Sequence, residues 1–269
     1  MRGKLELQEG LVIVSHSSEV VVEDLSGRLY TCRLRRKNER PVCGDRVEFN
    51  PLEHCIEKVL PRRSALSRPD SYRRIKPLAA NIDRFFIVCA VEPGIDFGLI
   101  DRYLVAAHAC SCDAVIVLNK SDLINDTHHL EVQRLRHYRE LNYPLIELST
   151  VTADGMNDLE NSFSQHTCIL VGQSGVGKSS IILQLIPDIE IRIGSLSEAT
   201  GSGCHTTTTT TLYHLPAGGD LIDSPGVRSF RLWNLEHEQV VAGFKEFQNY
   251  VDNCRFHNCR HIDEPGCAV

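Results

Sequence analysis

The sequence predicts a multidomain protein in which a small all-β barrel precedes an α/β domain and a small zinc-binding domain. Three observations support this: short β-branched segments between turn residues at the start, strand and helix patterns that alternate from Asn81 to Asp223, and a cysteine and histidine cluster near the end. We expect the domains to span residues 1–68, 69–232 and 233–269.

Length and composition are those of a soluble globular protein. The chain has 269 residues, of which 42% are hydrophobic and 24% are charged. No apolar run approaches the ~20 residues of a membrane span, and the start lacks the apolar core of a secretory signal. The cysteine count of 11 is odd, which argues against a disulfide framework. We therefore expect a cytoplasmic protein that does not contact membranes.

The first segments that look like strands span residues 10–14, 19–23, 28–34 and 45–49. Several strands within about 65 residues are typical of an OB-like barrel. Residues 1–76 carry 16 Lys and Arg against 11 Asp and Glu, whereas the rest of the chain carries 13 against 24. The run Arg35–Arg40 and the pair Arg62-Arg63 are either phosphate contacts for a nucleic acid or a solvated loop and a charged linker.

An α/β pattern follows. Its expected strands span residues 83–91, 113–118, 143–149, 167–171 and 219–223, and its expected helices 99–110, 128–141, 155–165 and 179–185. Such alternation predicts a parallel sheet with helices on both faces, and ligands bind such sheets at the carboxyl ends of strands. Polar or glycine residues occupy four of these ends: Asn119, Ser149, Gly172 and Asp223.

One strand runs into a glycine-rich loop that fits the phosphate-loop pattern, Gly172-Gln173-Ser174-Gly175-Val176-Gly177-Lys178-Ser179. Glycines let backbone N–H groups turn toward a phosphate at the start of a helix. Lys178 is expected to bridge the β- and γ-phosphates, and Ser179 to ligate Mg²⁺.

A second strand ends in Asn119-Lys120-Ser121-Asp122, which fits a guanine-reading motif. Asp122 would accept hydrogen bonds from the ring N–H and amine of guanine, which adenine cannot supply. Lys120 would pack along the base, and Asn119 would tie this loop to the phosphate loop. Ser149 is a looser match to a position that contacts the guanine oxygen.

The last motif is Asp223-Ser224-Pro225-Gly226. Asp223 would hold Mg²⁺ through water, and Gly226 would contact the γ-phosphate. Val227 cannot orient water as the Gln found there in many GTPases does, so slow intrinsic hydrolysis is expected. The preceding loop includes the threonine run 206–211. One of Thr206, Thr207 and Thr208 would complete Mg²⁺ coordination when GTP is bound, and Thr207 is our choice among them. His205 is either a water-positioning residue or a loop residue without a catalytic role.

Cys254, Cys259, His261 and Cys267 form a tetrahedral ligand set for structural zinc, with His257 as a rival ligand. Upstream, residues 235–250 are expected to form one amphipathic helix.

In an ordinary GTPase the phosphate loop comes first and the guanine motif last, whereas here the guanine motif leads.

Taken together, these motifs closely resemble the circularly permuted, small-ribosomal-subunit-dependent GTPases of bacteria, and the resemblance extends to Ser180 and to the segment 203–208. It implies an OB domain, a permuted GTPase domain that uses Mg²⁺ with GTP and GDP, and a zinc domain. It also implies action late in 30S maturation on 16S rRNA, with hydrolysis stimulated by the subunit and His205 at the position used in hydrolysis. We expect a monomer. Family members continue into a helical tail, whereas this sequence ends at Val269, so we expect either a truncated tail or a natural short form.

Two other functions compete with this interpretation. One is an RNA-binding protein whose GTPase domain is only a scaffold, although the intact Lys178, Ser179 and Asp223 speak against it. The other is an ATP-driven phosphotransferase built on the same loop, which the carboxylate of Asp122 argues against.

Overall fold

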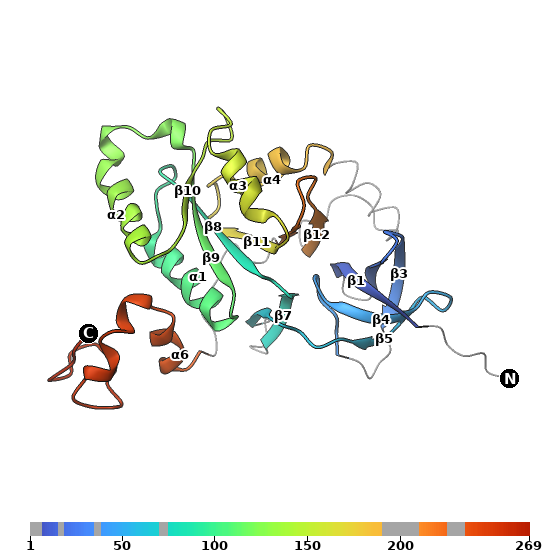
Figure 1. The fold of residues 1–269 in the computed structure, drawn as a ribbon, viewed down its shortest axis with the longest axis horizontal. Helices are drawn as coiled ribbons and strands as arrows, with labels where there is room; N and C mark the ends of the chain where they lie inside the picture. The colour runs from blue at the N-terminus through green and yellow to red at the C-terminus, as the bar shows by residue number, and fades with distance from the viewer. Residues whose placement is uncertain (1–6, 16–18, 35–38, 70–74, 190–209, 225–234) are drawn as a thin grey trace.

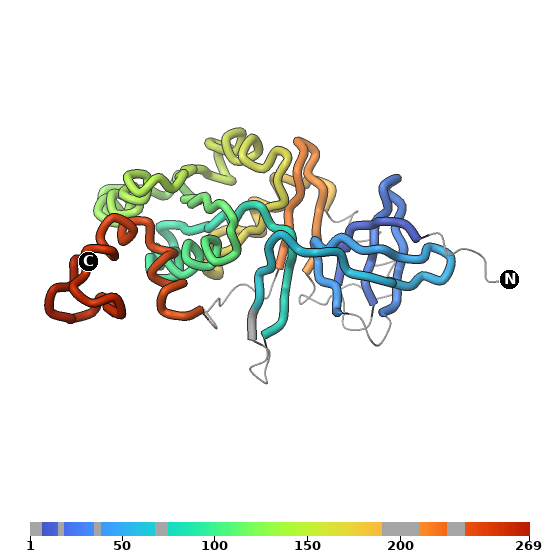
Figure 2. Tube along the Cα trace, turned by 60° about the horizontal axis from the view of Figure 1, so that its bottom comes forward, coloured from blue at the N-terminus to red at the C-terminus, as the bar shows by residue number. Residues whose placement is uncertain are grey.

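The structure is a computed structural model, and it describes residues 7–15, 19–34, 39–69, 75–189, 210–224 and 235–269. The chain forms a β-barrel, then an α/β domain, then a C-terminal part of short helices and turns (Figure 1). The barrel and the C-terminal part lie on opposite sides of the α/β domain (Figure 1, Figure 2). None of the helices in the described part of the chain has the length and apolar character of a membrane span.

The barrel has five strands: β1 (Gln8–Ser15), β2 (Glu19–Asp24), β3 (Leu29–Leu34), β4 (Arg46–Asn50) and β5 (Cys55–Val59). The strands pair in the order β1-β2-β3-β5-β4, and β1 closes the barrel by pairing with β4 as well. At Gly10, β1 pairs with both neighbours, and a Cβ there would lie 2.4 Å from Val22. Inward-facing apolar side chains, among them Val12, Val47 and Phe49, form the barrel core. The barrel expected from sequence is present.

The α/β domain contains β8 (Arg84–Ala90), α1 (Phe97–Ala109), β9 (Asp113–Asn119), α2 (His129–Glu140), β10 (Leu145–Glu147), α3 (Met156–Phe163), β11 (Thr167–Gly172), α4 (Lys178–Leu185), β12 (Thr210–His214) and β13 (Asp220–Asp223). Its strand order is β10-β9-β8-β11-β13-β12, and all neighbours are parallel except β12 and β13. Alternate residues of β8 face two separate cores, one covered by α1 and α2 and the other by α3 and α4. Buried β8 therefore reads as a continuous apolar run.

Strand β12 was not predicted, because a threonine run after a glycine-rich segment looks like a loop. It forms a strand here because it pairs with β13 on one side and with β1 of the barrel on the other. The β1 pairing joins the barrel sheet to the α/β sheet, and Figure 2 shows the two orange strands beside the barrel. A hairpin of β6 (Ala65–Pro69) and β7 (Ile75–Ala80) lies between the two domains, with Ala79 bridged to Cys43.

The prediction of a single helix over residues 235–250 is wrong. The structure has α6 (His237–Ala242), followed by two 3-10 turns at Lys245–Phe247 and Val251–Asn253. The helix ends at Gly243, where a Cβ would lie 2.8 Å from the Cα of Val105 on α1. This close approach requires glycine, and the chain then turns so that Lys245 lies 3.8 Å from the ring centre of Tyr143.

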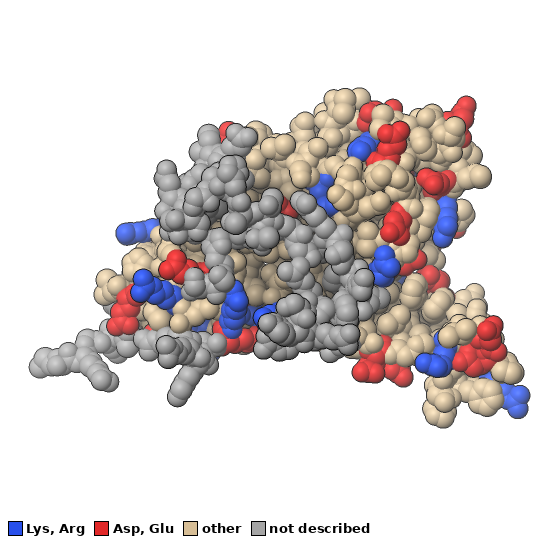
Figure 3. All heavy atoms as spheres, turned by 180° about the vertical axis from the view of Figure 1, so that it is seen from behind, with Lys and Arg blue, Asp and Glu red and all other residues tan. Residues whose placement is uncertain are grey.

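Cationic side chains near the barrel are partly engaged within the protein. Arg62 forms ion pairs with buried Asp45, at 2.7 Å, and with Glu39, so it supports the barrel instead of facing solvent. Arg63 pairs with Asp83 at 2.7 Å. Figure 3 shows Lys and Arg interspersed with Asp and Glu on the rear face. The basic residues at 35–37 and 73–74 lie outside the described residues.

Candidate functional site

The glycine loop lies between β11 and α4, as expected. Gly172, Gly175 and Gly177 have φ values of 139°, 85° and 93°, a region that glycine adopts at low cost. A Cβ on Gly172 would lie 2.1 Å from the carbonyl oxygen of Val88, so the loop packs directly on β8. Lys178, the first residue of α4, donates from Nζ to the carbonyls of Gly172 (2.8 Å) and Gln173 (2.5 Å). The ammonium group thus lies over the loop.

The guanine-type motif begins at the end of β9, two strands from β11 in the sheet. Asn119 is fully buried, and its Nδ2 donates to the carbonyl oxygen of Val176 in the glycine loop at 2.9 Å. A Cβ on Gly177 would lie 2.2 Å from the same Nδ2 atom. Asn119 and Val176 are 57 residues apart in sequence, and the two motifs are therefore in direct contact at the carboxyl ends of the strands.

Asp122 and Ser149 also contact each other at the carboxyl ends of the strands. The Ser149 hydroxyl donates to Oδ1 of Asp122 at 2.5 Å, and it accepts from the backbone N–H groups of Val151 and Thr152. Ser149 is fully buried, so these contacts fix the direction of the Asp122 carboxylate. Lys120 has φ 59° and donates to the carbonyl of Glu92 at 2.9 Å. Sequence reasoning missed Glu92, and only its position after a buried strand signals it.

The third motif begins at the end of β13, which pairs with β11. Asp223 lies opposite Thr211 of β12, and Ser224 lies 3.0 Å, Oγ to Oγ1, from Thr210. Ser179 and Ser180 are exposed at the start of α4. Three of the expected site residues lie outside the described residues: His205, Thr207 and Gly226. Ser121 of the guanine-type motif is described, and it is the first residue of a short 3-10 turn.

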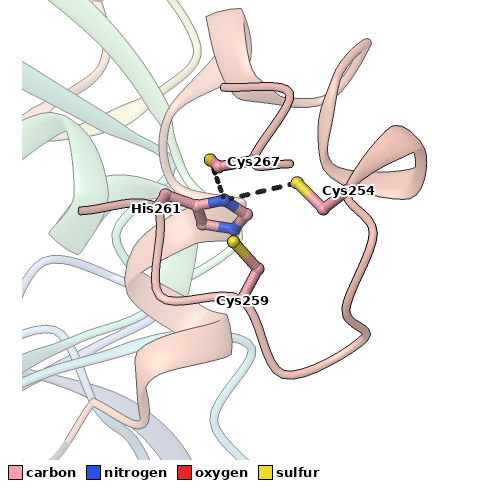
Figure 4. Close-up of side chains that lie close together, drawn as sticks. All are labelled: Cys254, Cys259, His261 and Cys267. Carbon is pink, nitrogen blue, oxygen red and sulfur yellow. Dashed lines mark hydrogen bonds between the residues drawn. The ribbon is translucent and has the colours of Figure 1, made fainter. Parts of the chain in front are cut away.

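The four residues expected to bind zinc gather at the C-terminal end. One ligand atom from each of Cys254, Cys259, His261 and Cys267 lies within 4.8 Å of the others (Figure 4). Nδ1 of His261 lies 3.6 Å from the sulfurs of both Cys254 and Cys267. This group does not include His257, the rival ligand. Three sulfurs and one imidazole are the donor set of a closed zinc site.

A backbone N–H group and two aromatic rings contact this cluster. The N–H of Ala268 donates to the sulfur of Cys254 at 3.4 Å, and this hydrogen bond lowers the pKa of the Cys254 thiol. The rings of His237 and Phe247 lie 6.0 and 6.2 Å from that of His261. All ten cysteines in the described residues are free of disulfides.

Comparison with known proteins identifies GTPases as similar in sequence. The family model of the RsgA GTPase matches residues 59–233. The chain is 45% identical to the small ribosomal subunit biogenesis GTPase RsgA of Actinobacillus pleuropneumoniae over 98% of this chain and 79% of that protein. It is 46% identical to the protein of the same name from Hahella chejuensis over 97% of this chain and 78% of that one.

Two crystal structures are similar in fold. YjeQ from Thermotoga maritima has a TM-score of 0.76 and 32% identity, covering 97% of this chain and 89% of that one. YloQ, described as a circularly permuted GTPase, has a TM-score of 0.73 and 28% identity, covering 100% of this chain and 88% of that one.

Proposed function

The chain belongs to the RsgA GTPase family, and we propose that it binds the small ribosomal subunit and hydrolyses GTP during late maturation of that subunit. It has the circularly permuted GTPase fold, in which the strand carrying the guanine motif precedes the strand carrying the glycine loop. The observation that carries the proposal is the hydrogen bond from Asn119 to Val176, because it joins the base-reading and phosphate-binding loops in one site.

For the base, we assign recognition of guanine to Asp122. Its contact with Ser149 supports this role, since a carboxylate held in one direction can accept a fixed pair of hydrogen bonds. Lys120 would cover the base, and Ser121 would complete the motif. An adenine base would leave the carboxylate without donors, which penalises ATP.

For the phosphates, we assign the backbone N–H groups of the glycine loop, at Gln173–Gly177, together with Lys178 and Ser180. The hydroxyl of Ser179 and the carboxylate of Asp223 are hard oxygen donors that fit Mg²⁺. When bound with GTP, Mg²⁺ would neutralise charge on the phosphates. Gly226 and Thr207 would contribute on the γ-phosphate side.

Hydrolysis would depend on the ribosomal partner. Val227 replaces the glutamine that positions water in many GTPases, and we assign that task to His205, with slow turnover until the subunit binds. The barrel is assigned to contact 16S rRNA, and Zn²⁺ bound by the Cys254 cluster would fix the C-terminal fold. We keep residues 1–68, 69–232 and 233–269 as domains of a cytoplasmic monomer.

The central experiment measures GTP turnover with and without purified 30S subunits at several salt concentrations. Stimulation that weakens as salt rises is expected, because phosphate contacts release counterions. Turnover that does not respond to the subunits would refute the assignment. The Ser179→Ala variant should lose GTP-dependent binding to 30S subunits, whereas in a scaffold protein it would bind as before.

Base specificity is tested by Asp122→Asn. A guanine-reading site should shift its preference toward xanthosine triphosphate, because the amide donates where the carboxylate accepts. An unchanged preference would instead indicate an ATP-dependent enzyme.

A further inference from the structure

A buried pair of hydroxyl groups joins the two segments of the α/β sheet that lie next to Asp223. Thr210 is the first residue of β12, and Ser224 directly follows β13. Their side-chain oxygens lie 3.0 Å apart, and the exposed fractions of the two residues are 9% and 5%. A hydrogen bond in such a buried position is costly to break, since each hydroxyl would lose its partner without gaining water.

The pair is held in place by strands on both sides. Thr210 pairs with Ser15 of β1, and the hydroxyl of Ser15 donates to the carbonyl of Pro41 at 3.0 Å. Next along β12, Thr211 pairs with Asp223 itself. The start of β12 is therefore fixed between the barrel and β13, and Thr210 is a rigid support for Ser224.

The far end of β12 is fixed too. His214 lies 2.6 Å from Asp220 of β13 and 2.5 Å from Glu23 of the barrel. Between the two ends, Leu212 and Tyr213 are buried in the two cores of the sheet. Strand β12 is thus paired with β1 and β13 and held by contacts at both ends, and the Thr210–Ser224 hydrogen bond connects it to the residue after Asp223.

We propose that Thr210 and Ser224 are positioning residues that hold the Asp223 carboxylate in the direction needed for Mg²⁺ and the γ-phosphate. The inference rests on the proposed function, since it deepens the role assigned to Asp223. Neither hydroxyl would contact the nucleotide; both would act through the backbone beside Asp223. The reaction class is unchanged, and the pair determines how well the site distinguishes GTP from GDP.

The test uses the full chain with fluorescent GDP and a non-hydrolysable GTP analogue, titrated over a range of Mg²⁺ concentrations. Thr210→Val and Ser224→Ala should each weaken analogue binding about tenfold at limiting Mg²⁺, as expected for one broken buried hydrogen bond. GDP binding without Mg²⁺ should stay at the wild-type value. Thr210→Ser keeps the hydroxyl and should restore analogue binding.

The double variant Thr210→Val/Ser224→Ala should bind no more weakly than either single variant, because both remove the same bond. Thr167→Val is the matched control, since its hydroxyl also reaches β13 but at Asp220, at 3.5 Å. The control should change only the melting temperature.

Losses that add in the double variant, or an unchanged Mg²⁺ response in both single variants, would overturn the inference. Failure of the wild-type protein to bind guanine nucleotides would instead refute the proposed function, so the two failures are distinguishable.

Discussion

Replacing Asn119 by alanine separates nucleotide affinity from protein stability. The change removes the 2.9 Å hydrogen bond from Nδ2 to the carbonyl of Val176, which is the direct contact between the two nucleotide loops. It also removes Oδ1, a buried oxygen without a hydrogen-bond partner among the described residues. Losing a buried partner costs about 1–3 kcal/mol, and removing an unsatisfied acceptor offsets about 1 kcal/mol of that.

We therefore expect Asn119→Ala to lower the free energy of unfolding by only about 1 kcal/mol. Nucleotide affinity should fall more, by about tenfold for GDP and GTP alike, because the loops lose their common register before any γ-phosphate contact is made. Equilibrium titration with fluorescent nucleotides measures the affinity, and urea denaturation measures the stability.

Asn125→Ala is the control, because the Asn125 side chain accepts from the N–H of Thr127 in an exposed turn of the neighbouring loop. It should leave affinity unchanged. A selective loss of GTP binding in Asn119→Ala, with GDP binding intact, would refute the reasoning, since the contact joins the base-reading loop to the glycine loop and GDP depends on both loops as GTP does.

Three further predictions concern the glycine loop, the cysteine cluster and strand β12. Gly177→Ala should abolish measurable nucleotide binding, because φ is 93° and a Cβ would press into a side-chain amide; native-like affinity would contradict this. Cys259→Ser should release zinc, measured by metal analysis, and lower the melting temperature without changing GDP affinity; full retention of zinc would exclude Cys259 as a ligand. Hydrogen bonds to Asp220 and Glu23 raise the pKa of His214 to about 10, above its ordinary value, so its stabilisation is complete below about pH 6.5 and is lost as pH rises through 10. Because the His214 side chain is half-exposed, we expect its two ion pairs to contribute only about 0.5–1 kcal/mol to the free energy of unfolding. Urea denaturation at pH 6 and pH 10 should show this loss in the wild-type protein and not in His214→Gln.

Sequence reasoning located most of the candidate site because each motif lies at a strand end that apolar patterning marks clearly. Asn119 ends β9 and Gly172 ends β11, both after continuous apolar runs. The four metal-binding candidates are close in sequence, so loop geometry alone brings them together. Strand β12 and the break at Gly243 escaped prediction, because each depends on a neighbour distant in the chain.

The motifs specify the candidate chemistry without reference to the fold: which side chains could read guanine, cradle phosphates and bind zinc, and in what order the chain presents them. The contact of Asn119 with Val176, the contact of Ser149 with Asp122 and the pairing of barrel strand β1 with β12 at Thr210 arise from the three-dimensional fold. This difference arises because motif chemistry is a property of adjacent residues, whereas strand pairing and side-chain contacts depend on packing between segments far apart in the chain.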